Sequence, residues 1–214
     1  KNGKKTVFVN FSGSAMAIVP ETQSCDAILQ AWYPGQAGGT AVADVLFGNY
    51  NPAGRLPITF YKSIQQLPDY EDYSMKGRTY RFMTETPLYP FGYGLSYTRF
   101  TYGDMHLSSE TLSENGDLTV SVTVSNVGNY DGYEIVQLYL HDIYAEIARP
   151  IKELKGFERI FLRKGESREV KFIITAADLK FYNSELQYLY EPGEFDVMVG
   201  PNSRDVQTKR FKAE

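Results

Sequence analysis

The sequence predicts a mainly β protein: a β-sandwich preceded by an incomplete piece of an α/β sandwich and by an irregular, aromatic-rich connecting strap. Residues 101–214 alternate apolar and polar side chains between closely spaced turn signals, as half-buried strands do. Residues 1–60 show one apolar strand and two short helical patterns. In residues 61–100 the apolar side chains follow no regular spacing, yet ten of these forty residues are aromatic. We therefore expect three segments with these boundaries.

Composition excludes several classes of protein. Of the 214 residues, 43% are hydrophobic and 22% are charged, which is typical of a globular protein and not of a disordered one. No apolar run reaches the ~18–20 residues needed to cross a bilayer, so we expect no membrane span. The single cysteine, Cys25, excludes an internal disulfide and a cysteine-based zinc site. Residues 101–214 carry 13 Lys and Arg against 19 Asp and Glu, which disfavours a nucleic-acid partner.

The first segment begins with Thr6 to Phe11, a β-branched and aromatic run that predicts a strand buried on both faces. We expect one helix from Ser24 through Trp32 and a second from Gly38 to Phe47, with Gly48 as a left-handed cap. One parallel strand and two short helices cannot cover themselves. We therefore expect the rest of this layer to lie upstream in a longer protein, which agrees with a start at Lys1 without a leader pattern.

The sandwich prediction rests on about eight short strands, of which Leu118 to Ser125 alternates most clearly. The other expected strands are Tyr102 to Leu107, Ile135 to Leu140, Leu154 to Phe161, Glu169 to Thr175, Tyr188 to Tyr190, Glu194 to Val199 and Gln207 to Phe211. Many short strands with no long helix are typical of a sandwich of the immunoglobulin or fibronectin type III kind. The connecting strap is expected to lie across a neighbouring surface, because it is too aromatic for a free linker.

Several local motifs suggest chemistry, but each has a structural interpretation that we prefer. His106 and His141 lack other ligands at metal spacing. The segment from Gly94 to Thr98 ends in threonine where a serine nucleophile elbow has glycine. Gly35 to Gly39 has the wrong spacing for a phosphate-binding loop and indicates close helix packing. The glycosylation sequon at Asn10 lies in a strand expected to be buried, so we interpret it as chance.

Carboxylates are numerous, and a glycosidase needs two of them facing each other across the bond that it cleaves. Glu71 and Asp72 are adjacent in an extended segment and point to opposite sides, so we interpret them as a solvated acidic patch. Trp32, Tyr33 and the tyrosines of the strap could stack on sugar rings, although aromatic residues in such a segment more often anchor it. We assign no catalytic residue, no metal ligand and no cofactor.

Two long motifs carry a family resemblance. The run from Ala31 to Gly48, AWYPGQAGGTAVADVLFG, continues through the NPAGRLP run from Asn51 to Pro57 and resembles the C-terminal part of glycoside hydrolase family 3. The GRTYRF run from Gly77 and the YPFGYGLSYT run from Tyr89 extend the similarity. Residues 118–200, with the RP pair at 149–150 and ELKGF at 153–157, resemble the fibronectin type III-like domain of that family.

The resemblance implies that both catalytic carboxylates lie upstream of this chain, so we expect the chain alone to be inactive and its role to be structural. The FSGS run from Phe11, the WYPGQ run from Trp32 and the GRTYR run from Gly77 look most like the β-xylosidase and α-L-arabinofuranosidase branch. The parent protein would then hydrolyse β-xylosides or α-L-arabinosides by a retaining mechanism, with a β-glucosidase as the alternative. Because proteins of this family are usually located outside the cytoplasm, the resemblance implies an extracytoplasmic location, either periplasmic or secreted.

In this family the α/β domain borders the substrate pocket. The resemblance therefore gives four candidates for substrate contact: Trp32, Tyr33, Arg78 and Tyr80. Arg81 could instead form a structural salt bridge with Glu71 or Asp72, which would contribute only ~0–1 kcal/mol if exposed.

Other classes of function stay open. A stand-alone carbohydrate-binding module would present Tyr139 or Tyr144 to a polysaccharide. A free-standing interaction domain is disfavoured, because the incomplete α/β layer would expose a strand edge. The expected partners are the upstream catalytic domains and, through them, a carbohydrate substrate. An isolated chain must cover its open layer in some way, and self-association is one such way.

Overall fold

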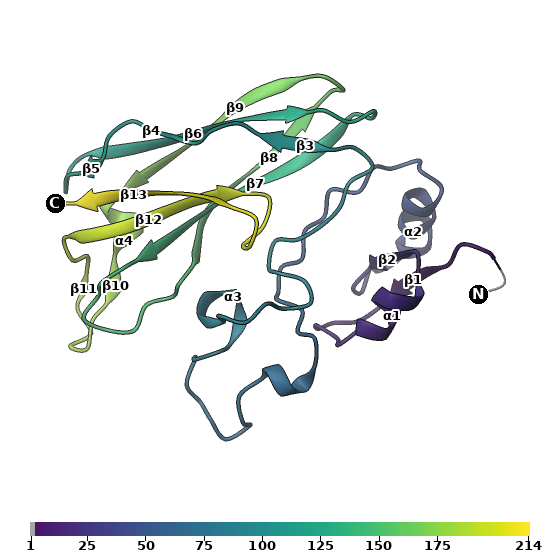
Figure 1. The fold of residues 1–214 in the computed structure, drawn as a ribbon, viewed down its shortest axis with the longest axis horizontal. Helices are drawn as coiled ribbons and strands as arrows, with labels where there is room; N and C mark the ends of the chain where they lie inside the picture. The colour runs from purple at the N-terminus through teal and green to yellow at the C-terminus, as the bar shows by residue number, and fades with distance from the viewer. Residues whose placement is uncertain (1–2) are drawn as a thin grey trace.

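The computed structural model describes residues 3–214, so Lys1 and Asn2, the first two residues of the predicted 1–60 segment, lie outside it. A β-sandwich occupies one end of the molecule and a small α/β piece the other, with irregular chain between them (Figure 1). No helix in the described part of the chain is long and apolar enough to cross a membrane.

The sandwich consists of two sheets. One has five strands in the order β5-β13-β12-β7-β8, and the other is built on β6, which pairs with β9 along one edge and with β3 and β4 along the other. The strands of the first sheet are β5 (Thr111–Leu112), β7 (Gly132–Asp142), β8 (Glu153–Leu162), β12 (Gly193–Gly200) and β13 (Gln207–Ala213). Those of the second are β3 (Phe100–Tyr102), β4 (His106–Leu107), β6 (Asp117–Asn126) and β9 (Ser167–Thr175).

The core lies between these sheets and follows the predicted alternation. In β6 every second residue from Leu118 to Val124 is at most 1% exposed, and in β7 the inward residues are Val136, Leu138 and Leu140. Such a two-layer arrangement buries one face of each strand and explains why period two is the strongest signal in residues 101–214. The predicted β-sandwich is thus confirmed.

Some short elements of the sandwich differ from prediction. The expected strand from Tyr102 to Leu107 is two strands, because β3 ends at Tyr102 and β4 begins at His106. Three elements were not predicted from the sequence: β5, β10 (Phe181–Tyr182) and α4 (Ala176–Leu179), whose capping box is formed by Thr175 and Asp178. The strand β10 pairs with β11 (Tyr188–Leu189) as a separate hairpin. Two-residue strands and a one-turn helix are too short to produce a periodic pattern of apolar residues in the sequence.

The α/β piece contains a two-stranded parallel sheet. The strand β1 (Val7–Asn10) pairs with β2 (Ala27–Gln30), and α1 (Val19–Ser24) connects them. The predicted helix from Ser24 through Trp32 is therefore wrong. A short apolar run fits a helix or a strand equally well, and here the backbone of β1 is available to pair with it.

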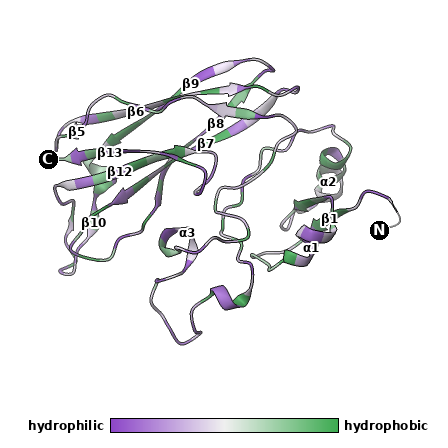
Figure 2. Ribbon diagram, in the orientation of Figure 1, coloured by the Kyte–Doolittle hydropathy of each residue, from purple (hydrophilic) through white to green (hydrophobic). Residues whose placement is uncertain are grey.

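The second predicted helix is confirmed as α2 (Gly38–Leu46), followed by Gly48 at φ +80°. The prediction that the first strand is buried on both faces is wrong for the described residues. Val7 and Phe11 are about half exposed, and within β1 only Asn10 is buried. Figure 2 shows hydrophobic residues on β1 at the end of the molecule away from the sandwich. Within the described residues β1 pairs only with β2, so its side chains stay largely accessible to solvent.

The connecting strap is largely irregular, as predicted, with one 3-10 turn, η1 (Ile64–Gln66), and one helical turn, α3 (Thr79–Phe82). An isolated bridge joins Phe60 to Tyr89, so the strap returns beside the chain that precedes it. Phe91 and Gly92 of the strap contact the outer face of β7, whose middle, residues 136–140, is consequently buried on both faces.

Candidate functional site at the strap and the sandwich

Aromatic rings of the strap cover the middle of β7. The ring of Tyr80 stacks on Phe91 with 4.2 Å between centroids, and both rings meet Tyr139 edge-on at 5.9 and 6.4 Å. The Tyr80 hydroxyl also accepts a hydrogen bond from the backbone N–H of Leu154 at 3.3 Å. Edge-on and stacked rings of this kind stabilise an interface beyond the area they bury. Tyr80 is therefore an anchor between the strap and strands β7 and β8.

Beside these rings, Gln137 of β7 binds the backbone of the strap. Its Nε2 donates to the carbonyl oxygens of Gly92 at 3.1 Å and Pro201 at 2.6 Å, while its Oε1 accepts from the Tyr139 hydroxyl. Gly92 has φ +79°, and a Cβ atom there would lie 2.0 Å from Gln137 Oε1. Only glycine fits this backbone conformation and this close approach.

A buried ion pair lies at the neighbouring end of β7. Arg55 Nη2 and Glu134 Oε2 are 3.0 Å apart, with 8% and 4% of their side chains exposed. The other carboxylate oxygen accepts from the Tyr102 hydroxyl at 3.2 Å, and Arg55 Nη1 donates to two backbone carbonyls. Burial raises the pKa of Glu134, and the attraction of Arg55 only partly opposes this. The pair joins the residues that follow α2 to the sandwich.

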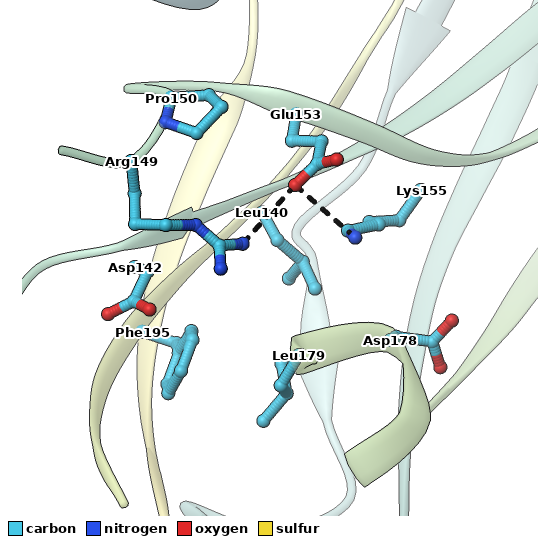
Figure 3. A pocket seen from close by; sticks show the side chains of 9 residues that line it. All are labelled: Leu140, Asp142, Arg149, Pro150, Glu153, Lys155, Asp178, Leu179 and Phe195. Carbon is cyan, nitrogen blue, oxygen red and sulfur yellow. Dashed lines mark ion pairs between the residues drawn. The ribbon is translucent and has the colours of Figure 1, made fainter. Parts of the chain in front are cut away.

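Arg81 and Glu153 form a third connection. Arg81 Nη2 lies 2.9 Å from Glu153 Oε1, and the second oxygen of Glu153 is approached by Arg149 at 3.5 Å and Lys155 at 3.3 Å. Figure 3 shows the latter two side chains converging on Glu153. The expected pairing of Arg81 with Glu71 or Asp72 is therefore wrong. Because the strap passes beside the start of β8, Glu153 is the carboxylate that Arg81 meets.

The cavity beside this cluster is very small. It has a volume of about 10 Å³, and Asp142 and Asp178 line it together with Glu153. Such a volume holds about one water molecule and no sugar ring. Burial raises the pKa of Asp142, against the opposing attraction of Arg149. The carboxylates gathered here thus face a space that a glycoside cannot enter.

Trp32 and Tyr33 lie in the loop between β2 and α2. Trp32 has φ +53°, an uncommon backbone conformation for a residue other than glycine, and its ring meets Phe60 edge-on at 6.1 Å. Tyr33 is 78% exposed, and its ring lies close to Gly13, where a Cβ would come within 2.6 Å. Of these two residues, Trp32 is half-buried against Phe60 and Tyr33 is exposed.

Arg78 contacts backbone carbonyls of the strap. Its Nε donates to Ser74 O at 3.0 Å, and its Nη2 donates to the carbonyl of Asp72. Asp72 accepts the backbone N–H of Ser74 at 2.8 Å, a bond that lowers the pKa of this exposed carboxyl. Glu71 is likewise exposed. The guanidinium of Arg78 thus closes an exposed loop, and Tyr80 is the one candidate of the four that lies at the strap–sandwich interface.

Other sequence motifs are also placed by the structure. Tyr139 is fully buried, so the expectation that it faces a polysaccharide is wrong, whereas Tyr144 is 77% exposed. The hydroxyl of Ser96 donates to Asn51 Oδ1 at 2.8 Å, a structural contact. The amide of Asn10 is buried and donates to Gln30 Oε1 at 2.6 Å, which agrees with interpreting the sequon as chance. Gly38 lies against Pro34 of the loop before α2, where a Cβ would come within 2.4 Å, and Gly39 has nothing within 4 Å of its Cβ position. A tight loop, and not packing against another helix, explains Gly38.

Neither histidine forms part of a metal site. No group of three or more His, Cys, Asp or Glu side chains among residues 3–214 is arranged to hold a metal ion. His141 is partly buried, which lowers its pKa against the opposing attraction of Asp196, and His106 is exposed.

Glu134 and Gln137 were not singled out from the sequence. The sequence does contain a sign of the role of Glu134. Side chains two residues apart in a strand point to the same face, so Glu134 points to the same face as the core residues Val136 and Leu138. A charged residue at an inward-facing position predicts a buried partner. No comparable signal marks Gln137, since a polar residue on an outward-facing position is ordinary.

Comparison with known proteins agrees with this architecture. Residues 1–97 match the glycosyl hydrolase family 3 C-terminal domain, and residues 134–203 match the fibronectin type III-like domain. The chain is 48% identical to a "Xylan 1,4-beta-xylosidase" from Xylanibacter ruminicola and 46% identical to a "Periplasmic beta-glucosidase" from Salmonella typhimurium. Each alignment covers 98% of this chain, but 24% and 29% of those two proteins, respectively.

Solved structures show the same similarity. A β-glucosidase from Erythrobacter marinus superposes with a TM-score of 0.87 at 40% identity, over 97% of this chain and 28% of that one. The chain thus spans less than a third of the length of these relatives. The two family matches, the relatives and the superposed structure together show that the chain belongs to glycosyl hydrolase family 3, as its C-terminal domain followed by a fibronectin type III-like domain.

Proposed function

We propose that this chain is the non-catalytic, structural C-terminal region of a family 3 exo-glycosidase. The observation that carries the proposal is that residues of the motifs shared with the family form contacts with the sandwich. Arg55, Arg81 and Gly92 connect the α/β side of the molecule to the sandwich through Glu134, Glu153 and Gln137. Arg55 and Arg81 each bind a carboxylate of the sandwich through Nη2, and the Gly92 carbonyl accepts from Gln137, so these contacts are structural.

Within this proposal each segment has its own role. Residues 1–60 supply the last strands and helices of the α/β layer, residues 61–100 connect the modules, and residues 101–214 form a sandwich that supports them. The catalytic carboxylates would lie in upstream domains, which are the proposed partners of this chain. The half-exposed Phe11 and the exposed Phe47 support a role for upstream chain in covering the α/β piece.

We further propose that the parent protein hydrolyses β-xylosides or α-L-arabinosides by a retaining mechanism. The 48% identity to the xylosidase supports this substrate class. A β-glucosidase parent is the alternative, favoured by the 46% identical periplasmic enzyme and by the superposed β-glucosidase structure. The periplasmic location in the name of the Salmonella protein supports an extracytoplasmic location for the parent.

The test is hydrolysis of nitrophenyl β-xyloside, α-arabinofuranoside and β-glucoside by the longer protein that carries this chain. The proposal expects the β-xyloside or the α-arabinofuranoside to have the highest kcat/KM. A clear preference for β-glucoside would replace the proposed substrate class by its alternative. Absence of hydrolysis of all three substrates would overturn the proposal of a glycosidase parent.

A further inference from the structure

A second cavity, with a volume of about 150 Å³, lies between the strap and the loops at one end of the sandwich. Met83, Pro87 and Pro90 form an apolar wall on the strap side. Lys152 and Arg204 line the opposite wall, from the segment before β8 and the turn between β12 and β13. The strap also contributes the polar residues Thr84, Glu85 and Thr86, so the cavity combines an apolar patch with one carboxylate and two cations.

The walls of this cavity are held by direct contacts between strap and sandwich. The backbone N–H of Ile151 donates to Arg81 O at 2.8 Å, and that of Ser203 donates to Phe91 O at 2.9 Å. At the base, Thr59 Oγ1 accepts from the N–H of Tyr80 at 3.0 Å, which leaves the hydroxyl hydrogen of Thr59 free to donate. The pocket is therefore largely pre-formed, as small-ligand sites usually are.

Lys152 carries a positive charge that the described residues do not neutralise directly. Its Nζ donates to Ser203 O at 2.6 Å, but within residues 3–214 no carboxylate oxygen lies within 4.0 Å of it. Burial lowers the pKa of Lys152, with Asp205 acting in the opposite direction. Both oxygens of Asp205 are already bound by Arg204 at 3.0 Å. Asp205, which does not itself line the cavity, is therefore bound to Arg204 and acts on Lys152 only from a distance.

Glu85 lines the cavity on the strap, and its Oε2 accepts from Gln66 Nε2 at 3.2 Å. Within residues 3–214 it forms no ion pair with Lys152, because its oxygens lie more than 4.0 Å from the Lys152 Nζ. An ammonium group that keeps unfilled donors favours a ligand carboxylate, because hydrogen bonds between charged groups are the strong ones.

Size and polarity define the rest of the ligand. The volume is well below the ~300–1,000 Å³ of pockets for drug-sized molecules, so a single sugar ring or a smaller molecule fits. The apolar wall suits the C–H face of a pyranose, while Thr59 and Glu85 can bind hydroxyl groups. We propose that this cavity binds a uronate, a single sugar ring bearing a carboxylate, with Lys152 binding the carboxylate. This inference does not depend on the proposed function.

The test is isothermal titration of the 214-residue chain with D-glucuronate, with D-glucose and acetate as separate controls for the ring and the carboxylate. We expect glucuronate to bind at least about tenfold more tightly than either control, because glucose lacks the carboxylate and acetate lacks the sugar ring. Lys152→Gln should weaken glucuronate binding by about tenfold or more. The matched variant Lys171→Gln removes a lysine from an exposed ion pair on β9 and should leave binding unchanged.

A second measurement tests the site without any substitution. In methyl NMR spectra of the unmodified chain, glucuronate should shift the Met83 methyl resonance and leave that of Met105, buried in the sandwich core, in place. No binding of glucuronate, equal binding of glucose or acetate, or equal loss in both lysine variants would overturn the proposal. A shift of Met105 without one of Met83 would do so as well.

Discussion

At the scale of single residues, the buried pair of Arg55 and Glu134 has the clearest energetic consequence. Breaking a buried ion pair by removing one partner typically costs about 3–5 kcal/mol, because the remaining charge stays buried and unpaired. The pair therefore stabilises a particular arrangement of the α/β piece against β7 more than it stabilises the sandwich itself.

The raised pKa of Glu134 gives a pH dependence with a defined sign. A carboxyl whose folded-state pKa lies above its unfolded value of 4.5 stabilises the fold fully below that value. This contribution is lost as the pH rises through the folded-state pKa. We therefore expect the unfolding free energy of the wild type, relative to Glu134→Gln, to fall as the pH is raised from 4 to 8. Denaturant titrations across this range measure the difference, and a difference independent of pH would contradict the account.

Two tyrosines should respond differently to truncation in the longer protein. Tyr80→Ala removes an anchored ring and should lower stability by roughly 3 kcal/mol, as core aromatic truncations do. Tyr33→Ala removes an exposed ring and should leave the melting temperature unchanged. If the loop of Tyr33 reaches the substrate, KM should rise about threefold to tenfold through lost stacking. Unchanged KM in Tyr33→Ala would remove it from the substrate-contact candidates.

At the scale of elements, the contact between the strap and β7 depends on Gly92. We expect Gly92→Ala to destabilise the chain by more than about 2 kcal/mol, because the added Cβ meets Gln137 and strains a left-handed backbone. Gly165→Ala is the matched control, since Gly165 has φ +78° with nothing within 4 Å of its Cβ position. It should cost only the backbone strain, about 1 kcal/mol. Equal losses in chemical denaturation would show that the contact with Gln137 contributes nothing.

The elements also show where sequence reasoning succeeds. Strands such as β6 were predictable because one face is buried and the other is exposed, which imposes period two. The strand β2 was mistaken for a helix because its four residues depend on pairing with β1, a contact remote in sequence. Tyr139 was misjudged for a similar reason. Its outward-facing position predicts exposure, but the strap covers it.

The candidate site was less predictable than the fold. The motif residues Arg55 and Arg81 could be singled out from the sequence, but their partners Glu134 and Glu153 lie more than seventy residues away. The cavity beside Lys152 is formed by four separate stretches of chain, and no periodic pattern signals such a convergence. Contacts between distant segments are what a single sequence specifies least directly.

At the scale of the whole molecule, the open α/β piece governs how the isolated chain should behave. Phe47 is 82% exposed and Phe11 53%, and exposed apolar surface of this kind promotes association. We expect the average mass of the 214-residue chain to rise with concentration in sedimentation equilibrium. The double variant Phe11→Ser and Phe47→Ser should reduce this association. A monomer over the whole concentration series would contradict the expectation.

The central claim is that this chain supports catalysis without carrying it out. The most direct measurement is xyloside hydrolysis by a chimera in which this chain replaces the corresponding region of the Xylanibacter ruminicola protein, which is 48% identical to it. The chain alone and the truncated partner are assayed beside it. The account predicts activity in the chimera and none in either part. Hydrolysis by the 214-residue chain alone, or an inactive chimera that is correctly folded, would contradict it.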